Sequence, residues 1–168
     1  MVEISVTLIK ELRERTSAGV IDCKKALEST NGDIEKACDV LREQGLARVE
    51  KKKDRVAVEG IIEAYVHHGG RIGAMVEVNC ETDFVAKTDE FKALAHDLAL
   101  QVAAASPQYV SADEMPQTEE AEAEEVCLLE QPFIKDQAVK VRDLVLDVSA
   151  RVGEKVIVRR FARFQLGE

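Results

Sequence analysis

Residues 71–105, RIGAMVEVNCETDFVAKTDEFKALAHDLALQVAAA, decide the fold of this chain. Every second residue from Ile72 to Cys80 is apolar, which predicts a half-buried β-strand. From residue 90 to residue 105 the apolar residues recur at three- and four-residue steps, which predicts an amphipathic helix. The segment Thr82–Val85 therefore lies where a strand is followed by a helix. Its polar residues, Thr82 and Asp83, favour a turn at that junction.

Phe84 and Val85 are apolar residues in this predicted connector, and they allow two interpretations. Connecting segments often carry functional residues, so an aromatic side chain held between a strand and a helix can insert into a partner. Alternatively, both side chains pack beneath the following helix as apolar residues usually do, and Asp83 is an ordinary turn residue or helix cap. The residue pattern leaves both interpretations open.

The composition limits the classes of function. The 168 residues are 46% hydrophobic but only 4% aromatic, which predicts one or two domains with cores of Leu, Ile, Val and Ala. A net charge of -9 argues against nucleic acid as a direct partner, because phosphate binding requires a basic surface. No apolar run approaches the ~20 residues that span a bilayer. Residues 1–5 do not resemble a signal peptide, so we expect a cytoplasmic protein that does not bind membranes.

Cysteine and histidine patterns argue against a metal site or an enzyme. The four cysteines are Cys23, Cys38, Cys80 and Cys127. They form no C-x-x-C pair, so we interpret them as reduced, buried residues. A zinc site of Cys80, His67 and His68 is disfavoured because the usual ligand spacings are missing. A Cys80 nucleophile with a histidine base lacks a third orienting group. We expect no cofactor, no metal and no catalytic residue.

Residues 1–47 predict a module of three short helices that docks on a partner. Ser5 is a candidate N-cap of the first helix and Asp33 of the third, and Gly45 is a candidate end of the third helix. Residues 48–55 contain Lys51-Lys52-Lys53 and few apolar residues, which predicts a basic linker.

Residues 56–168 predict an α+β core domain. Strands at 58–66 and 71–80 are joined by a hairpin turn, and helices are expected at 90–105 and 139–151. The acidic segment 111–125 predicts a solvated loop with a helical stub. A final strand at 155–164 should place Val156 and Val158 on one face and Ile157 and Phe161 on the other. The fold class is therefore a three-helix module followed by a small antiparallel sheet with helices packed on one face.

Four blocks of sequence resemble bacterial elongation factor Ts along essentially the whole chain. They are VTLIKELRERTSAGVIDCKKAL at 6–27, NGDIEKACDVLREQG at 31–45, RIGAMVEVNCETDFVAK at 71–87 and GEKVIVRRFARF at 153–164. The resemblance implies a translation elongation factor that associates with GDP-bound and nucleotide-free elongation factor Tu. It implies that this factor promotes GDP release so that GTP can bind, without covalent chemistry.

The resemblance also implies site residues. The family's Thr-Asp-Phe-Val motif, which displaces Mg²⁺ and disturbs the phosphate-binding region of elongation factor Tu, falls on Thr82, Asp83, Phe84 and Val85. The partner-binding residues that it implies in the N-terminal module are Arg13, Gly19, Val20 and Ile21. Many relatives carry two methionines where this chain has Val20-Ile21.

Longer relatives carry a second core unit that this chain lacks, which leads us to expect a homodimer. Its surface should come from the hairpin at 58–80 and from the final strand, with Val156, Val158 and Phe161. The alternative is a monomer in which the acidic segment and the loop at Phe133 cover the sheet. An alternative function is a non-catalytic adaptor that binds another helical partner.

Overall fold

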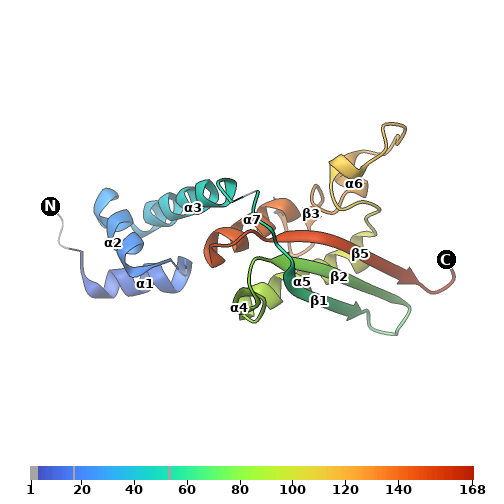
Figure 1. Cartoon of the computed structure of the whole chain (residues 1–168), viewed down its shortest axis with the longest axis horizontal. Helices are drawn as coiled ribbons and strands as arrows, with labels where there is room; N and C mark the ends of the chain where they lie inside the picture. The colour runs from blue at the N-terminus through green and yellow to red at the C-terminus, as the bar shows by residue number, and fades with distance from the viewer. Residues whose placement is uncertain (1–3, 17, 53) are drawn as a thin grey trace. The chain divides into compact units, whose positions relative to one another are not determined.

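The computed structural model describes residues 4–16, 18–52 and 54–168, and it divides the chain into two compact units. Unit 1 comprises the chain up to Asp54 together with Ser149–Glu154, and unit 2 comprises Arg55–Val148 and Lys155–Glu168 (Figure 1). Expectations that fell on Met1–Glu3 and Lys53 lie outside the described residues. None of the helices in the described ranges has the length and apolarity that crossing a bilayer requires.

Unit 1 contains three helices, α1 (Val6–Thr16), α2 (Val20–Ser29) and α3 (Ile34–Glu50). The Ser5 hydroxyl oxygen accepts the Leu8 N–H at 3.2 Å, and an Asp33 carboxylate oxygen accepts the Lys36 N–H at 3.1 Å, which confirms both predicted N-caps. One apolar cluster joins the three helices. Its buried members are Leu12, Cys23, Ala26, Leu27, Ala37 and Leu41.

Gly45 does not end the third helix, because α3 continues to Glu50. Gly45 is buried inside α3, and a Cβ atom at this position would lie 2.7 Å from the Cβ of Ala150. Glycine is therefore required at this position because Ala150 packs closely against it within unit 1. The sequence pattern had instead suggested a helix terminus. Lys52 follows the helix and donates a hydrogen bond to the carbonyl oxygen of Gly153.

Unit 2 is built on a three-stranded antiparallel sheet in the order β1-β2-β5, formed by β1 (Glu59–Val66), β2 (Ile72–Cys80) and β5 (Ile157–Gln165). The predicted hairpin turn is present, with positive φ at Gly69 and Gly70. Helix α5 (Asp89–Ala105) packs on one face of the sheet, behind it in Figure 1. Residues Ala74, Val76, Val78, Phe91, Leu94 and Leu98 are buried. The predicted α+β fold class is confirmed.

The remaining elements of unit 2 are short. They are α4 (Asp83–Ala86), a 3₁₀ turn (Ala112–Glu114), α6 (Ala123–Val126), β3 (Pro132–Phe133), β4 (Asp136–Lys140) and the greater part of α7 (Val141–Val152). The helix expected from residue 139 begins at Val141, because the preceding residues pair with β3. The acidic segment carries the 3₁₀ turn and α6, in agreement with the predicted helical stub.

A β-bulge in β5 overturns one prediction about the final strand. Val158 pairs with Val78 and Phe161 pairs with Val76, so Arg159 is an extra residue that breaks the period of two. Because paired residues share a face, Phe161 lies on the same face as Val158 and not on the opposite one. The bulge also brings Arg160 within 2.7 Å of the Glu77 carboxylate.

Candidate functional site

The segment Thr82–Val85 forms the start of a one-turn helix. Thr82 has an extended backbone conformation, and its hydroxyl oxygen accepts the Val85 N–H at 3.5 Å, so it is the N-cap of α4. The thiol of Cys80, the last residue of β2, donates to the Thr82 carbonyl oxygen at 3.1 Å. The predicted turn between strand and helix is therefore a capped helical turn that follows directly from the central strand.

Helix α4 points Phe84 and Val85 in different directions. Phe84 is 78% exposed, whereas Val85 is 9% exposed and Ala86 is buried beside it. Successive side chains of a helix are about 100° apart, so one can face the core while its neighbour faces solvent. The packing interpretation is thus correct for Val85 and wrong for Phe84. An aromatic side chain exposed to this extent is available for contact with a partner.

Asp83 is ionised beside Phe84. A carboxylate oxygen of Asp83 lies 2.5 Å from the Nζ atom of Lys87, one helical turn further on. The hydrogen bond and the charge of Lys87 lower the pKa of Asp83, and the same contact raises the pKa of Lys87. The exposed surface of α4 therefore presents an aromatic ring next to a carboxylate that stays charged at neutral pH.

The candidate partner-binding residues of unit 1 lie at the start of α2 and on α1. Gly19 is the N-cap of α2, and the two residues that follow are exposed, Val20 to 53% and Ile21 to 70%. Arg13 is exposed on α1. Val6 on α1 is also 69% exposed. The sequence pattern did not distinguish it from the buried apolar residues of that helix. Unit 1 therefore offers three exposed aliphatic side chains at the starts of two helices, Val20 and Ile21 on α2 and Val6 on α1.

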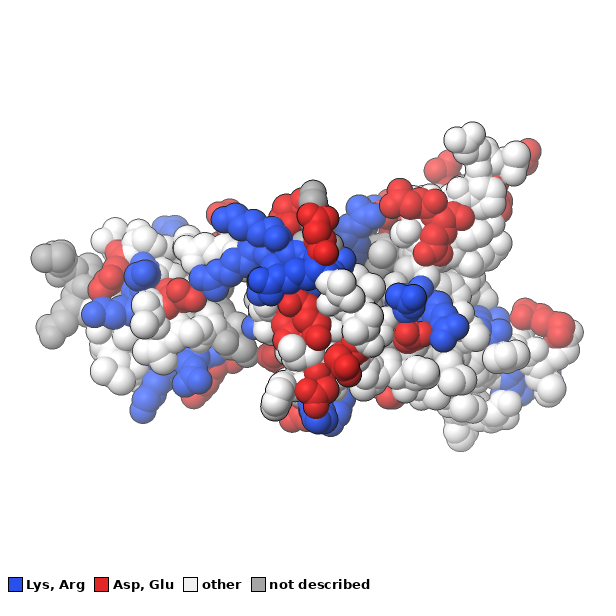
Figure 2. Space-filling model, viewed as in Figure 1, with Lys and Arg blue, Asp and Glu red and all other residues white. Residues whose placement is uncertain are grey.

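The face of the sheet away from α5 carries a second exposed apolar surface, which we call the open face. Its large apolar side chains are Ile62, Val66, Met75 and Phe164, exposed to 60%, 67%, 47% and 71%. The strand register puts them on one side. Met75 pairs with Ala64 and Ala162, and the other three residues lie two positions from one of these alanines in the same strand. Figure 2 shows largely uncharged surface over the β1–β2 hairpin.

The open face uses other residues than the sequence suggested. Val156 and Val158 are 7% and 8% exposed, so they belong to the buried core. Phe161 lies on the covered side as a result of the bulge. Phe164 replaces them as the apolar contribution of β5 to the open face. The expected hairpin does contribute, through Ile62, Val66 and Met75.

Two of the residues weighed for catalysis or metal binding, Cys80 and His67, have structural contacts. The Cys80 thiol is fully buried, and Nδ1 of His67 lies 3.1 Å from the Tyr65 hydroxyl. All four cysteines are free thiols. Across the described ranges, no three His, Cys, Asp or Glu side chains gather where they could hold a metal ion.

Comparison with known proteins identifies the family. The family model described as "Elongation factor TS" matches residues 24–125. The elongation factor Ts of Carboxydothermus hydrogenoformans is 50% identical over 195 residues, covering 98% of this chain and 90% of that protein. The protein of the same name from Herpetosiphon aurantiacus is 50% identical over 194 residues, covering 98% of both chains. The chain therefore belongs to the elongation factor Ts family.

Proposed function

We propose that this protein is the cytoplasmic nucleotide exchange factor of elongation factor Tu. It associates with the GDP-bound partner, promotes release of GDP and leaves the nucleotide-free partner ready to bind GTP. The observation that carries this proposal is the exposure of Phe84, which is 78% accessible at the position of the family's Thr-Asp-Phe-Val motif. A chain that used this motif only for stability would bury the ring.

The proposed mechanism assigns different tasks to the four residues of the motif. Phe84 inserts beside the nucleotide site of the partner, and the ionised Asp83 enters with it. Together they displace Mg²⁺ and disturb the phosphate-binding region. Thr82 caps α4 and Val85 anchors it in the core, so these two residues hold the ring in its outward position. No bond is made or broken in this chain.

The energy required is within reach of such a contact. Factor and nucleotide must weaken each other's binding to the partner by the same factor, because their coupling is reciprocal. A thousandfold weakening of GDP binding corresponds to about 4 kcal/mol. One aromatic residue buried at the centre of an interface contributes up to about 4 kcal/mol, and loss of Mg²⁺ contacts adds to it.

Arg13, Gly19, Val20 and Ile21 supply a second contact with the same partner in this proposal. Exposed aliphatic residues at a helix start can dock in an apolar groove, and Arg13 can pair with a carboxylate at its rim. Two linked contacts bind far more tightly than either one alone, because the second forms at a high effective concentration. Binding through unit 1 therefore brings the motif of unit 2 to the nucleotide site.

Release of a fluorescent GDP analogue from elongation factor Tu tests the proposal. We expect micromolar amounts of this protein to accelerate release by at least tenfold, and excess GDP to dissociate the complex of the two proteins. Binding to elongation factor Tu without acceleration of GDP release would refute the exchange function. No binding to elongation factor Tu would refute both the exchange function and the assigned sites, and it would favour an adaptor that binds another helical partner.

We further propose that the open face joins two copies of this chain. A two-fold dimer covers a surface with the same surface of its partner, which suits the exposed apolar side chains of the open face, Ile62, Val66, Met75 and Phe164. Light scattering should then give twice the 18.6 kDa of one chain. Met75→Glu should give monomers, whereas Leu146→Glu, on α7, should not. A mass of one chain that does not rise with concentration would refute the dimer.

A further inference from the structure

Glu81 is a partly buried carboxylate immediately before the proposed exchange motif. Its side chain is only 14% exposed. It follows Cys80, the last residue of β2, and precedes Thr82, the N-cap of α4. A carboxylate in such a place is stable only when both oxygens have partners. Its partners therefore indicate what the strand end is attached to.

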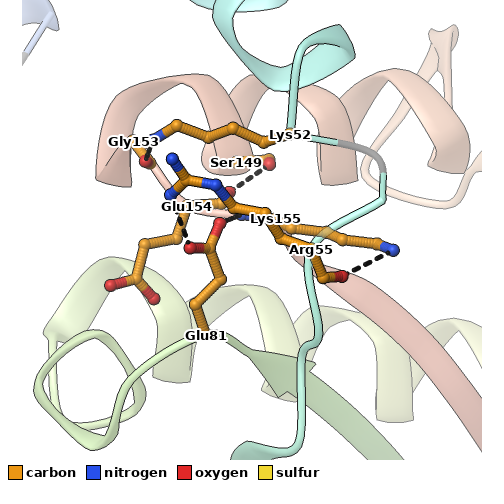
Figure 3. A network of polar contacts seen from close by, with 7 residues as sticks. All are labelled: Lys52, Arg55, Glu81, Ser149, Gly153, Glu154 and Lys155. Carbon is orange, nitrogen blue, oxygen red and sulfur yellow. Dashed lines mark hydrogen bonds and ion pairs between the residues drawn. The ribbon is translucent and has the colours of Figure 1, made fainter.

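Both oxygens of Glu81 bind segments that are distant in the sequence (Figure 3). One oxygen accepts the backbone N–H of Lys155 at 2.7 Å, and the other accepts from the Arg55 guanidinium at 2.9 Å. The Lys155 ammonium closes the ring of contacts by donating to the Arg55 carbonyl oxygen at 3.0 Å. We call these three residues the Glu81 cluster.

Two members of the Glu81 cluster lie where the chain enters unit 2. Arg55 is the first residue of unit 2, and Lys155 is the residue at which the chain re-enters unit 2 after Glu154. Glu81 thus ties both entry points to the strand end that carries α4. The cluster lies wholly within unit 2, and it joins the base of α4 to two segments that the sequence separates by a hundred residues.

Helix α4 needs such an anchor. A four-residue helix has too few internal hydrogen bonds to be stable alone, so its orientation depends on what holds its ends. Val85 and Ala86 fix its inner side, and Thr82 caps its start. Glu81 is the residue before this cap, and its contacts with Arg55 and Lys155 hold it in place. We infer that Glu81 is a positioning residue, which holds α4 so that Phe84 meets the nucleotide site of elongation factor Tu.

This inference rests on the proposed exchange function, and two measurements separate them. Glu81→Gln keeps an oxygen for the Lys155 N–H but places an amide against the Arg55 guanidinium. We expect the maximal GDP release rate, at saturating factor, to fall at least fivefold. The half-saturating concentration should change less than twofold, because the contacts of unit 1 are untouched. A purely structural loss would instead lower the amount of active protein and leave the rate per folded molecule unchanged.

Hydrogen exchange of α4 tests the positioning without elongation factor Tu. The amides of Ala86, Lys87 and Thr88 donate within this helical turn. In Glu81→Gln they should exchange at least fivefold faster than in the natural chain. Glu130→Gln is the matched control, since the Glu130 side chain is 13% exposed and also pairs with an arginine, Arg142. It should change neither measurement. If Glu81→Gln folds poorly, Arg55→Gln is the second variant, because it removes the same ion pair. It should show the same effects on both measurements.

The outcomes are distinct. Faster α4 exchange with a reduced maximal rate supports the inference. Unchanged α4 exchange in both cluster variants overturns it, and so does faster exchange with an unreduced rate. If the natural chain does not accelerate GDP release from elongation factor Tu, the proposed exchange function is refuted. Amide hydrogen exchange of α4 then still decides whether Glu81 positions this helix.

Discussion

Replacing Phe84 by alanine tests whether the ring contacts the partner or stabilises the core. A Phe side chain carries about 200 Å² of surface, and Phe84 leaves 78% of its surface available to a partner. At about 25 cal/mol per Å², burying that area in a complex contributes about 4 kcal/mol. Alanine keeps a small part of it, so Phe84→Ala should lose about 3 kcal/mol of partner contact. This loss corresponds to about a hundredfold in GDP release at subsaturating factor.

The same substitution should hardly change stability. Exposed substitutions usually alter the free energy of unfolding by less than about 0.5 kcal/mol, whereas a buried Phe→Ala costs about 3–5 kcal/mol. For a chain of this size, 3–5 kcal/mol would lower the melting temperature by roughly 10 °C. The assay is fluorescent GDP release beside thermal unfolding, with Leu146→Ala as a control for loss of an exposed apolar side chain. A large melting shift with normal release per folded molecule would refute the reasoning.

Three further predictions concern other parts of the chain. Ile21→Ser should weaken binding to elongation factor Tu about tenfold by titration calorimetry with little melting change, whereas Val6→Ser, equally exposed on α1, should not. Gly45→Ala should destabilise unit 1 by about 1–3 kcal/mol in denaturant unfolding, despite alanine's higher helix propensity, because the added methyl meets Ala150; a more stable variant would contradict the packing. Lys87→Ala should return the pKa of Asp83 to the ordinary range in an NMR titration, since Lys87 lowers it. The Asp83–Lys87 contact stabilises the folded chain at pH values above the unfolded-state pKa of Asp83. This stabilisation is lost as the pH falls through the lowered folded-state pKa.

Much of the fold could be predicted from local patterns. The period of two in β2 and the three- and four-residue steps in α5 identify both elements, because each buries one face against the other. The caps at Ser5 and Asp33 are equally local signals, since each side chain satisfies an amide three residues on. Such features depend only on neighbours in the sequence.

The errors arise where a distant contact decides the local structure. Gly45 was expected to end a helix, but its conformation is helical and its small size serves the approach of Ala150. The extra residue Arg159 follows from the register between β5 and β2, which no period within β5 reveals. The partners of Glu81 are likewise set by the arrangement of three separate segments. Sequence patterns of a single element cannot contain this information.

The orientation of Phe84 combines both kinds of information. A turn and a helix start are both compatible with Thr82-Asp83, and only the helical turn separates the direction of Phe84 from that of Val85. Leaving the Phe84 side chain in water forgoes about the same 4 kcal/mol that burial of its exposed area would contribute. Four other contacts nevertheless hold it outward: the Thr82 cap, the Val85 and Ala86 packing, and the Glu81 pairing. The ring that these contacts hold outward is available to a partner, as the proposed exchange function requires.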